Sequence, residues 1–266
     1  MTRPAVAEGL LAWSPRAGLR PVGNAGDAGG PLLVADSWLV RDGRVRGLGR
    51  HRERFLRSCG ECGGPPSYRL REFWRDMTAA LPRTGGWFPR VELTPRHVRL
   101  RLRHAPPLGA GIEVWAVGRP DPRTVPRRKG PDLDILAGVR GRAVEAGAQE
   151  AVLVGPSGVV LEAATASVLW WEGDTLCLPP PRLPLLPGVT VALVRERATR
   201  CGIRVAHRER TLAQLDGHEV WLVNALHGIR PVTRWVGGPT GAGPAVRAPE
   251  WRKWLDGEAM RPLPEV

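Results

Sequence analysis

The hydrophobic and polar positions in the first half of the chain predict strands, one tight turn and one amphipathic helix. Residues 31–41, PLLVADSWLVR, have the composition of a strand, and Asp42-Gly43 is a hairpin signal that returns residues 44–48 as the partner strand. Ser67 can cap a helix whose apolar residues recur along one stripe: Leu70, Phe73, Trp74, Met77 and Leu81.

Alternation then predicts further strands. Val98, Leu100 and Leu102 alternate with arginines, which is typical of a half-buried strand, and residues 112–117 form another. The first half is therefore expected to be α+β, with a mostly antiparallel sheet.

A proline-rich segment, GRPDPRTVPRRKGPD at 118–132, indicates a linker between two parts of the chain. It suggests a small N-terminal domain over 1–117, a linker over 118–128 and a larger domain over 129–266. In the larger domain the pattern predicts a helix from residue 133, a second helix from about 190 to 201 ending at Gly202, and a short helix around Trp251 and Trp254. Strands are expected at 150–154, 158–161, 166–172, 175–178, 203–207 and 218–224, and a flexible segment at 237–248.

Composition narrows the class of protein. The formal net charge is +13, but the arginines are spread along the chain, which favours a general arginine bias or an anionic ligand over a nucleic-acid partner. No apolar run approaches the ~20 residues of a membrane span, and no signal segment opens the chain, so a cytoplasmic location is expected. The Cys59-Gly60-Glu61-Cys62 motif has no second cysteine pair, so we expect reduced thiols and no metal.

Lys129 stands out because the only other lysine is Lys253. A lysine amine can lose its proton and act as a nucleophile, which an arginine cannot do. Lys129 is therefore either a reactive amine beside the linker or a residual surface charge.

Two other stretches suggest ligand binding. In LLPGVT, residues 185–190, Gly188 precedes a predicted helix whose first amides could bind a phosphate. The alternative is an ordinary helix N-terminus that binds no ligand. Glu162 ends an apolar strand, where it is either an ordinary strand-end charge or the partner of a protonated pyridine nitrogen.

In their order and spacing, five motifs resemble the fold-type IV pyridoxal-phosphate enzymes, which include branched-chain and D-amino-acid aminotransferases and 4-amino-4-deoxychorismate lyase. They are His51-x-x-Arg54, Lys129, Glu162-Ala-Ala-Thr165, Leu186-Pro-Gly-Val-Thr190, and Ala225 through Pro231-Val232. The resemblance implies an α+β protein with a small N-terminal α/β domain, a larger domain with a β-barrel-like sheet, and pyridoxal 5'-phosphate in the interdomain cleft.

The resemblance also implies roles for individual residues. Lys129 would form the Schiff base and Glu162 would pair with the pyridine nitrogen. Arg54, Val189 and Thr190 would bind the phosphate, with Asn224 and Ala225 also at the cofactor. A homodimer and a small anionic amino substrate are implied as well, with neither nucleic acid nor membrane as a partner.

The sequence departs from the family pattern at positions that bear on the substrate more than on the cofactor. Ala225 stands where aminotransferases often have threonine, and Asn224-Ala225-Leu226 is closer to the aminodeoxychorismate lyases. The resemblance therefore favours a lyase that releases pyruvate and gives 4-aminobenzoate. The alternative is an aminotransferase acting on branched-chain or D-amino acids.

Overall fold

The computed structural model describes residues 8–22, 30–116, 120–238 and 241–265, and it divides into two compact units. Unit 1 contains the described residues up to Leu108, Arg128–Pro131 and those from Ala259 onward. Unit 2 contains the described residues of Gly109–Arg127 and Asp132–Glu258. The units are thus not the consecutive ranges expected from the sequence, since the chain returns to unit 1 at Arg128 and again at Ala259. Val117 and the first two residues of the expected linker lie outside the described residues.

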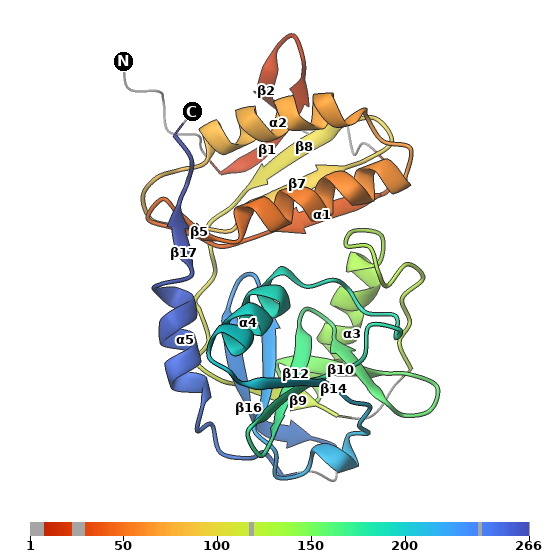
Figure 1. The fold of residues 1–266 in the computed structure, drawn as a ribbon. Helices are drawn as coiled ribbons and strands as arrows, with labels where there is room; N and C mark the ends of the chain where they lie inside the picture. Colours follow the sequence, from red (N-terminus) through yellow and green to blue (C-terminus); the bar gives the residue numbers. More distant parts are fainter. Residues whose placement is uncertain (1–7, 23–29, 117–119, 239–240, 266) are drawn as a thin grey trace. The chain divides into compact units, whose positions relative to one another are not determined.

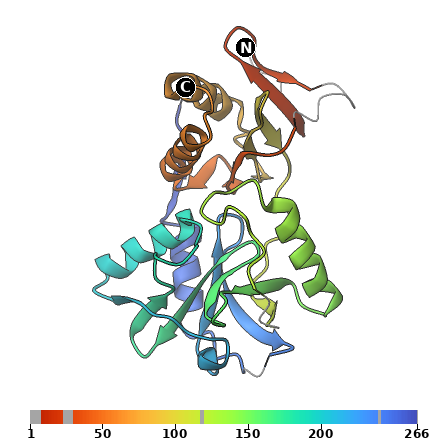
Figure 2. The same ribbon diagram turned by 90° about the vertical axis from the view of Figure 1, so that its right-hand side faces the viewer.

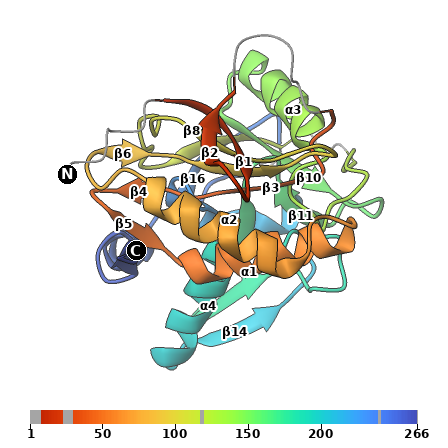
Figure 3. The same cartoon turned by 90° about the horizontal axis from the view of Figure 1, so that it is seen from above.

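Unit 1 is built on a five-stranded antiparallel sheet, as the alternating pattern predicts. Helices α1 (Leu48–Glu61) and α2 (Ser67–Ala80) cover one face of this sheet (Figures 1 and 3). In spatial order the strands are β2 (Gly18–Pro21), β1 (Gly9–Ser14), β8 (Val98–Leu102), β7 (Arg90–Leu93) and β3 (Val34–Ser37).

The predicted apolar stripe of α2 is confirmed, because all five of its residues are buried. The start of the helix differs by one position: Ser67 is its first residue, Pro66 occupies the N-cap, and no side chain caps the helix. A proline at that place costs nothing, because the first amides of a helix have no partner inside it.

The strand predicted over 31–41 is in fact two strands in two sheets. β3 pairs with β7, whereas β4 (Val40–Arg41) joins a second sheet with the order β17 (Met260–Pro262), β5 (Arg44–Arg46), β4 and β6 (Gly86–Trp87). The predicted turn is confirmed: Asp42 and Gly43 have φ of 48° and 69°, the left-handed pair that a two-residue hairpin requires.

Unit 2 is built on a closed barrel of six strands, and two further strands extend it. The barrel closes because its first strand also pairs with its last one. Around the barrel the strands are β11 (Val160–Ala163), β10 (Glu150–Val154), β9 (Ile112–Trp115), β16 (Gly228–Val236), β15 (Val220–Asn224) and β12 (Ser167–Glu172), and β13 (Thr175–Leu178) and β14 (Arg204–His207) continue from β12. This is the barrel-like sheet that the resemblance implied.

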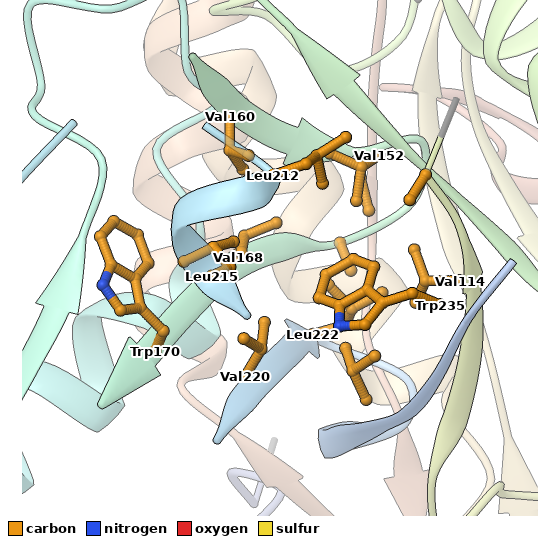
Figure 4. Packing of buried hydrophobic residues seen from close by; sticks show 14 of the residues in the cluster. Val114, Val152, Val160, Val168, Trp170, Leu212, Leu215, Val220, Leu222 and Trp235 are labelled. Atoms are coloured by element: carbon orange, nitrogen blue, oxygen red, sulfur yellow. The ribbon is translucent and has the colours of Figure 1, made fainter. Parts of the chain in front are cut away.

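Side chains from facing strands fill the barrel (Figure 4). Val114, Val152, Val168 and Leu222 point into it, and the 3₁₀ turn Ala213–Leu215 adds Leu215 to the same cluster. Burial of each such side chain contributes about 1.5–3 kcal/mol to the stability of the fold. This core therefore fixes the positions of the strands whose ends carry the candidate site.

Three helices complete unit 2: α3 (Leu133–Glu145), α4 (Val189–Arg200) and α5 (Ala248–Asp256). α3 and α4 lie on opposite sides of the barrel (Figure 2). The predicted end of α4 is confirmed, since Gly202 follows it with φ of 70°. Residues 239–240 of the expected flexible segment fall outside the described residues. Among the helices that are described, none has both the length and the apolar character to cross a membrane.

Candidate functional site

Backbone contacts hold Lys129 against β3. The Ala35 amide donates a hydrogen bond to the Lys129 carbonyl at 2.7 Å. Gly130 has φ of 138°, and a Cβ there would come within 2.8 Å of the backbone of Val34 and Ala35. Glycine is therefore required directly after Lys129, and the lysine is fixed at the edge of the unit 1 sheet.

The Lys129 amine has the properties of a nucleophile. Its side chain is half-buried, and within the described part of the chain the amine has no hydrogen-bond or ion-pair partner. Burial lowers the pKa of Lys129 to about 8; the arginines at 54, 90 and 103 act in the same direction, and Asp36 opposes them. More of the amine is thus unprotonated at neutral pH than in an exposed lysine.

Both residues of the His51-x-x-Arg54 motif bind one buried carboxylate, that of Asp36. Arg54 donates to it through Nε at 2.8 Å and Nη2 at 2.7 Å, and His51 Nδ1 lies 2.8 Å from Oδ1. Although burial alone would raise it, Arg54 and His51 hold the pKa of Asp36 well below its usual range. Burial lowers the pKa of His51, and because an ionised carboxylate can only accept, Nδ1 is the donor in its bond to Asp36.

Glu162 is the corresponding buried carboxylate of unit 2. Its Oε2 accepts from Arg123 Nη1 at 2.6 Å and from the Leu186 amide at 2.9 Å, whereas the one donor to Oε1 among the described residues is the Ser167 hydroxyl, at 3.2 Å. Burial raises the pKa of Glu162, and Arg123 counteracts this only in part. Oε1 can therefore accept another donor, and the carboxylate stays basic enough to hold it.

Arg123 and Arg127 fix the proline-rich loop beside Glu162. Arg123 donates to Asp121, Glu162 and the Pro184 carbonyl, and Arg127 donates to the carbonyls of residues 181–183. These contacts place the loop that leads into α4.

The first turn of α4 presents amides that no described side chain caps. Gly188 is its N-cap, no side chain caps the helix, and its first turn contains no acidic residue. A Cβ on Gly188 would come within 3.1 Å of Ser167 Oγ, so a side chain there would disturb the hydroxyl that binds Glu162. Val189 and Thr190 therefore begin the helix directly beside the Glu162 network, with the polarity that attracts an anion.

Asn224 organises the turn between β15 and β16. Its Oδ1 accepts from the amides of Leu226 and His227 at 3.1 and 2.8 Å, and its Nδ2 donates to the Thr165 carbonyl at 3.2 Å. This links the turn that contains Ala225 to the Glu162–Thr165 motif.

Within each unit, the structure connects residues that the sequence offered separately. Arg54 and Lys129 both lie in unit 1; Glu162, Val189 and Thr190 lie around Ser167 in unit 2. Sequence reasoning missed Asp36, Arg123 and Ser167 as site residues. For Arg123 a signal existed, because a charged Asp-Pro-Arg triplet inside a proline-rich segment suggests a fixed loop.

Comparison with known proteins identifies the family. The model of the family described as amino-transferase class IV matches residues 33–235, most of the chain. The chain belongs to the class IV aminotransferases. It matches none of the curated proteins.

Solved structures of similar fold include class IV aminotransferases and a candidate lyase. A hypothetical aminotransferase from Mycobacterium tuberculosis in its PLP-bound form is 20% identical, with a TM-score of 0.75 over 93% of this chain and 98% of that one. The Escherichia coli branched-chain amino acid aminotransferase is 18% identical (TM-score 0.77; 94% of each chain). A candidate 4-amino-4-deoxychorismate lyase from Legionella pneumophila is 16% identical (TM-score 0.70; 85% and 90%).

For this class IV chain, the residues present fit a pyridine cofactor that carries an aldehyde and a phosphate. Lys129 supplies an amine with a lowered pKa, and Glu162 supplies a buried carboxylate oxygen with room for a ring N–H. The uncapped start of α4 suits a phosphate. Arg54 uses two of its nitrogens to bind Asp36, so this carboxylate fixes the orientation of the guanidinium.

Proposed function

We propose that this chain is a pyridoxal-phosphate-dependent 4-amino-4-deoxychorismate lyase. The reaction releases the enolpyruvyl group as pyruvate and leaves 4-aminobenzoate, and it consumes neither water nor a keto acid. Family membership supports the cofactor, and the amine, carboxylate and helix terminus described above support its binding residues.

Each predicted residue has a role in this proposal. Lys129 carries the cofactor, then takes the proton from the substrate carbon that bears the nitrogen. Glu162 holds the proton on the pyridine nitrogen. Arg54 and the amides of Val189 and Thr190 bind the phosphate, with Asn224 and Ala225 at the neighbouring turn. When bound, the cofactor supplies an electron sink for the departing bond.

The observation that carries the lyase over a branched-chain aminotransferase is an arginine-rich face of the unit 1 sheet. Arg90, Arg99 and Arg101 all bind the single carboxylate of Glu92, at 2.7–3.0 Å. By strand alternation Arg103 shares this face. Its Nε donates to the Phe88 carbonyl, and among the described residues it forms no hydrogen bond or ion pair with a carboxylate, although Glu92 acts on it electrostatically. Burial lowers the pKa of Arg103, and Arg90 and Arg101 add to the effect.

Such a face suits a substrate with two carboxylates. Arg90 and Arg103 also act on the Lys129 amine, so this positive charge lies within electrostatic range of the proposed chemistry. A branched-chain amino acid would bring an apolar side chain to the same arginines and offer them no second carboxylate. An aminotransferase acting on branched-chain or D-amino acids is the alternative.

Product analysis separates the two functions. We expect pyruvate from aminodeoxychorismate without any added keto acid, and no glutamate from branched-chain or D-amino acids with 2-oxoglutarate. The opposite result would establish the aminotransferase. Lys129→Arg should abolish the reaction and the borohydride-stable attachment of the cofactor, whereas Lys253→Arg, at the only other lysine, should change neither.

A cytoplasmic homodimer also belongs to the proposal, on the basis of the family resemblance. Light scattering on the eluting protein should give twice the chain mass. A monomer that retains full activity would contradict this part of the proposal while leaving the reaction untouched.

A further inference from the structure

Arg230 is a buried arginine that the proposed reaction does not use. It lies on β16, opposite Leu222 of β15 and two residues before Val232, and both of these belong to the barrel core. Directly paired residues and residues two apart share a face of a sheet, so Arg230 points into the barrel. Its exposed fraction is 7%.

No described residue provides an acceptor for the guanidinium of Arg230. Its Nε is buried without a hydrogen-bond partner, and within the described ranges no residue forms a hydrogen bond or ion pair with the side chain. Buried arginines are ordinarily paired, because removing an uncompensated charge from water is costly. The protein alone therefore leaves this charge unsatisfied.

The one acidic group nearby is already engaged. Glu150 also points inward, as it precedes Val152 on β10, but its carboxylate accepts from the Thr165 hydroxyl and the Ala151 amide and forms no ion pair with Arg230. Burial lowers the pKa of Arg230 to about 10, with Glu150 as the only opposing influence. Two binding groups are thus adjacent without satisfying one another.

The remaining neighbours add positive charge and a glycine-rich backbone. Arg140 and Arg252 both repel the charge of Arg230. Arg252 donates to the carbonyls of Gly109 and Ala110, and a Cβ on Gly109 would come within 3.6 Å of Arg230 Cδ. The segment at 109–110 is thereby held against the side chain of the arginine.

We propose that Arg230 is the centre of a binding site for a small carboxylate anion inside the mouth of the barrel. The planar guanidinium matches the two oxygens of a carboxylate, and the adjacent arginines favour an anion over a neutral molecule. The carboxylate comes either from a free small acid or from the substrate, and the site does not depend on which reaction Lys129 performs.

Thermal unfolding with sodium formate tests the site. Formate should raise the melting temperature of the wild type by a few degrees, as expected for a ligand that binds only the folded state. Arg230→Gln should lose this gain, and Arg230→Lys, which keeps the charge without the fork, should retain a small part of it. Arg57→Gln removes the same charge from an exposed position on α1 of unit 1 and should keep the gain.

Kinetics distinguish the two sources of the carboxylate. If formate competes with the substrate and Arg230→Gln raises KM at least tenfold, the bound group belongs to the substrate; if KM is unchanged, it belongs to a free acid. Both results support the site. The proposal would be overturned if formate raised the melting temperature of the wild type no more than that of a folded Arg230→Gln variant. If that variant does not fold, the test is the NMR signal of ¹³C-formate with the wild type, and the absence of saturable binding would overturn the proposal.

Discussion

Asp36 in unit 1 and Glu162 in unit 2 are both almost fully buried and both bind an arginine, yet their pKa values move in opposite directions. Asp36 receives two bonds from Arg54 and one from His51, and together these outweigh burial. Glu162 receives one bond from Arg123, which also serves Asp121, and here burial prevails.

The difference separates two uses of a buried carboxylate. Asp36 is a fixed counter-ion: its oxygens are occupied and its charge holds the motif residues in place. Glu162 keeps an oxygen with only one donor and a raised pKa, which suits a group that must hold a proton on a ligand. Four experiments can break or sharpen this contrast.

The largest effect is expected for Asp36→Asn. Removing the charge takes the carboxylate partner away from the buried guanidinium of Arg54, which should cost about 3–5 kcal/mol in the free energy of unfolding, measured by urea denaturation. Asp174→Asn, at an exposed carboxylate that pairs with Arg247, should change stability little. If the double variant Asp36→Asn with Arg54→Gln is no more stable than Asp36→Asn alone, the counter-ion role is wrong.

Glu162→Gln should mainly affect activity. Glutamine still accepts from the Leu186 amide and Arg123 keeps Asp121, so the fold should survive, while kcat falls roughly 10²-fold because the proton on the ligand loses its anionic partner. Glu113→Gln, at an exposed ion pair with Arg234, serves as the control. An unchanged kcat in a fully loaded enzyme would contradict the role of Glu162.

The pH dependence of stability should differ in sign between the two carboxylates. The folded pKa of Asp36 is depressed, so its contribution is present above its unfolded pKa, about 4, and is lost as the pH falls. The folded pKa of Glu162 is raised, so its contribution is present below about 4 and is lost as the pH rises through the folded value. Urea midpoints from pH 3 to 7 should therefore rise relative to Asp36→Asn and fall relative to Glu162→Gln; parallel profiles would refute the contrast.

The smallest effect is expected for Ser167→Ala. It removes one donor from Oε1 of Glu162 while the Arg123 and Leu186 contacts remain, so kcat should fall by a few-fold, about 1 kcal/mol in the activation barrier. The control is Ser67→Ala, at a serine whose exposed hydroxyl accepts a hydrogen bond from Arg71, and its kcat should not change. A loss as large as that of Glu162→Gln would mean that Ser167 itself touches the ligand.

Local patterns in the sequence predicted local structure well. The Asp42-Gly43 turn and the stripe on α2 depend on neighbouring residues alone, and both are confirmed. The segment 31–41 was wrongly predicted as a single strand, because Trp38 and Leu39 are buried at the point where the chain leaves one sheet for another. A uniform apolar run does not reveal such a crossing.

The long-range contacts of the site could not be predicted in this way. The sequence shows no apolar stripe that would predict α1, because the buried face of this helix includes His51, Arg54 and Ser58. Their partner Asp36 lies 15 and 18 residues earlier on a strand, and Arg123 lies 39 residues before Glu162. Motif order identified which residues belong to the site, but the partners that set each pKa depend on tertiary packing.

The two returns of the chain to unit 1 have a consequence for folding kinetics. Arg44 donates to the Met260 carbonyl across 216 residues, and the Lys129 segment reaches β3 across more than 90. Contacts so distant in sequence form slowly, because the intervening loop must close before they stabilise anything. We therefore expect these two contacts to form after much of unit 2 is compact, so a variant that slows barrel formation should also delay the appearance of a reactive Lys129.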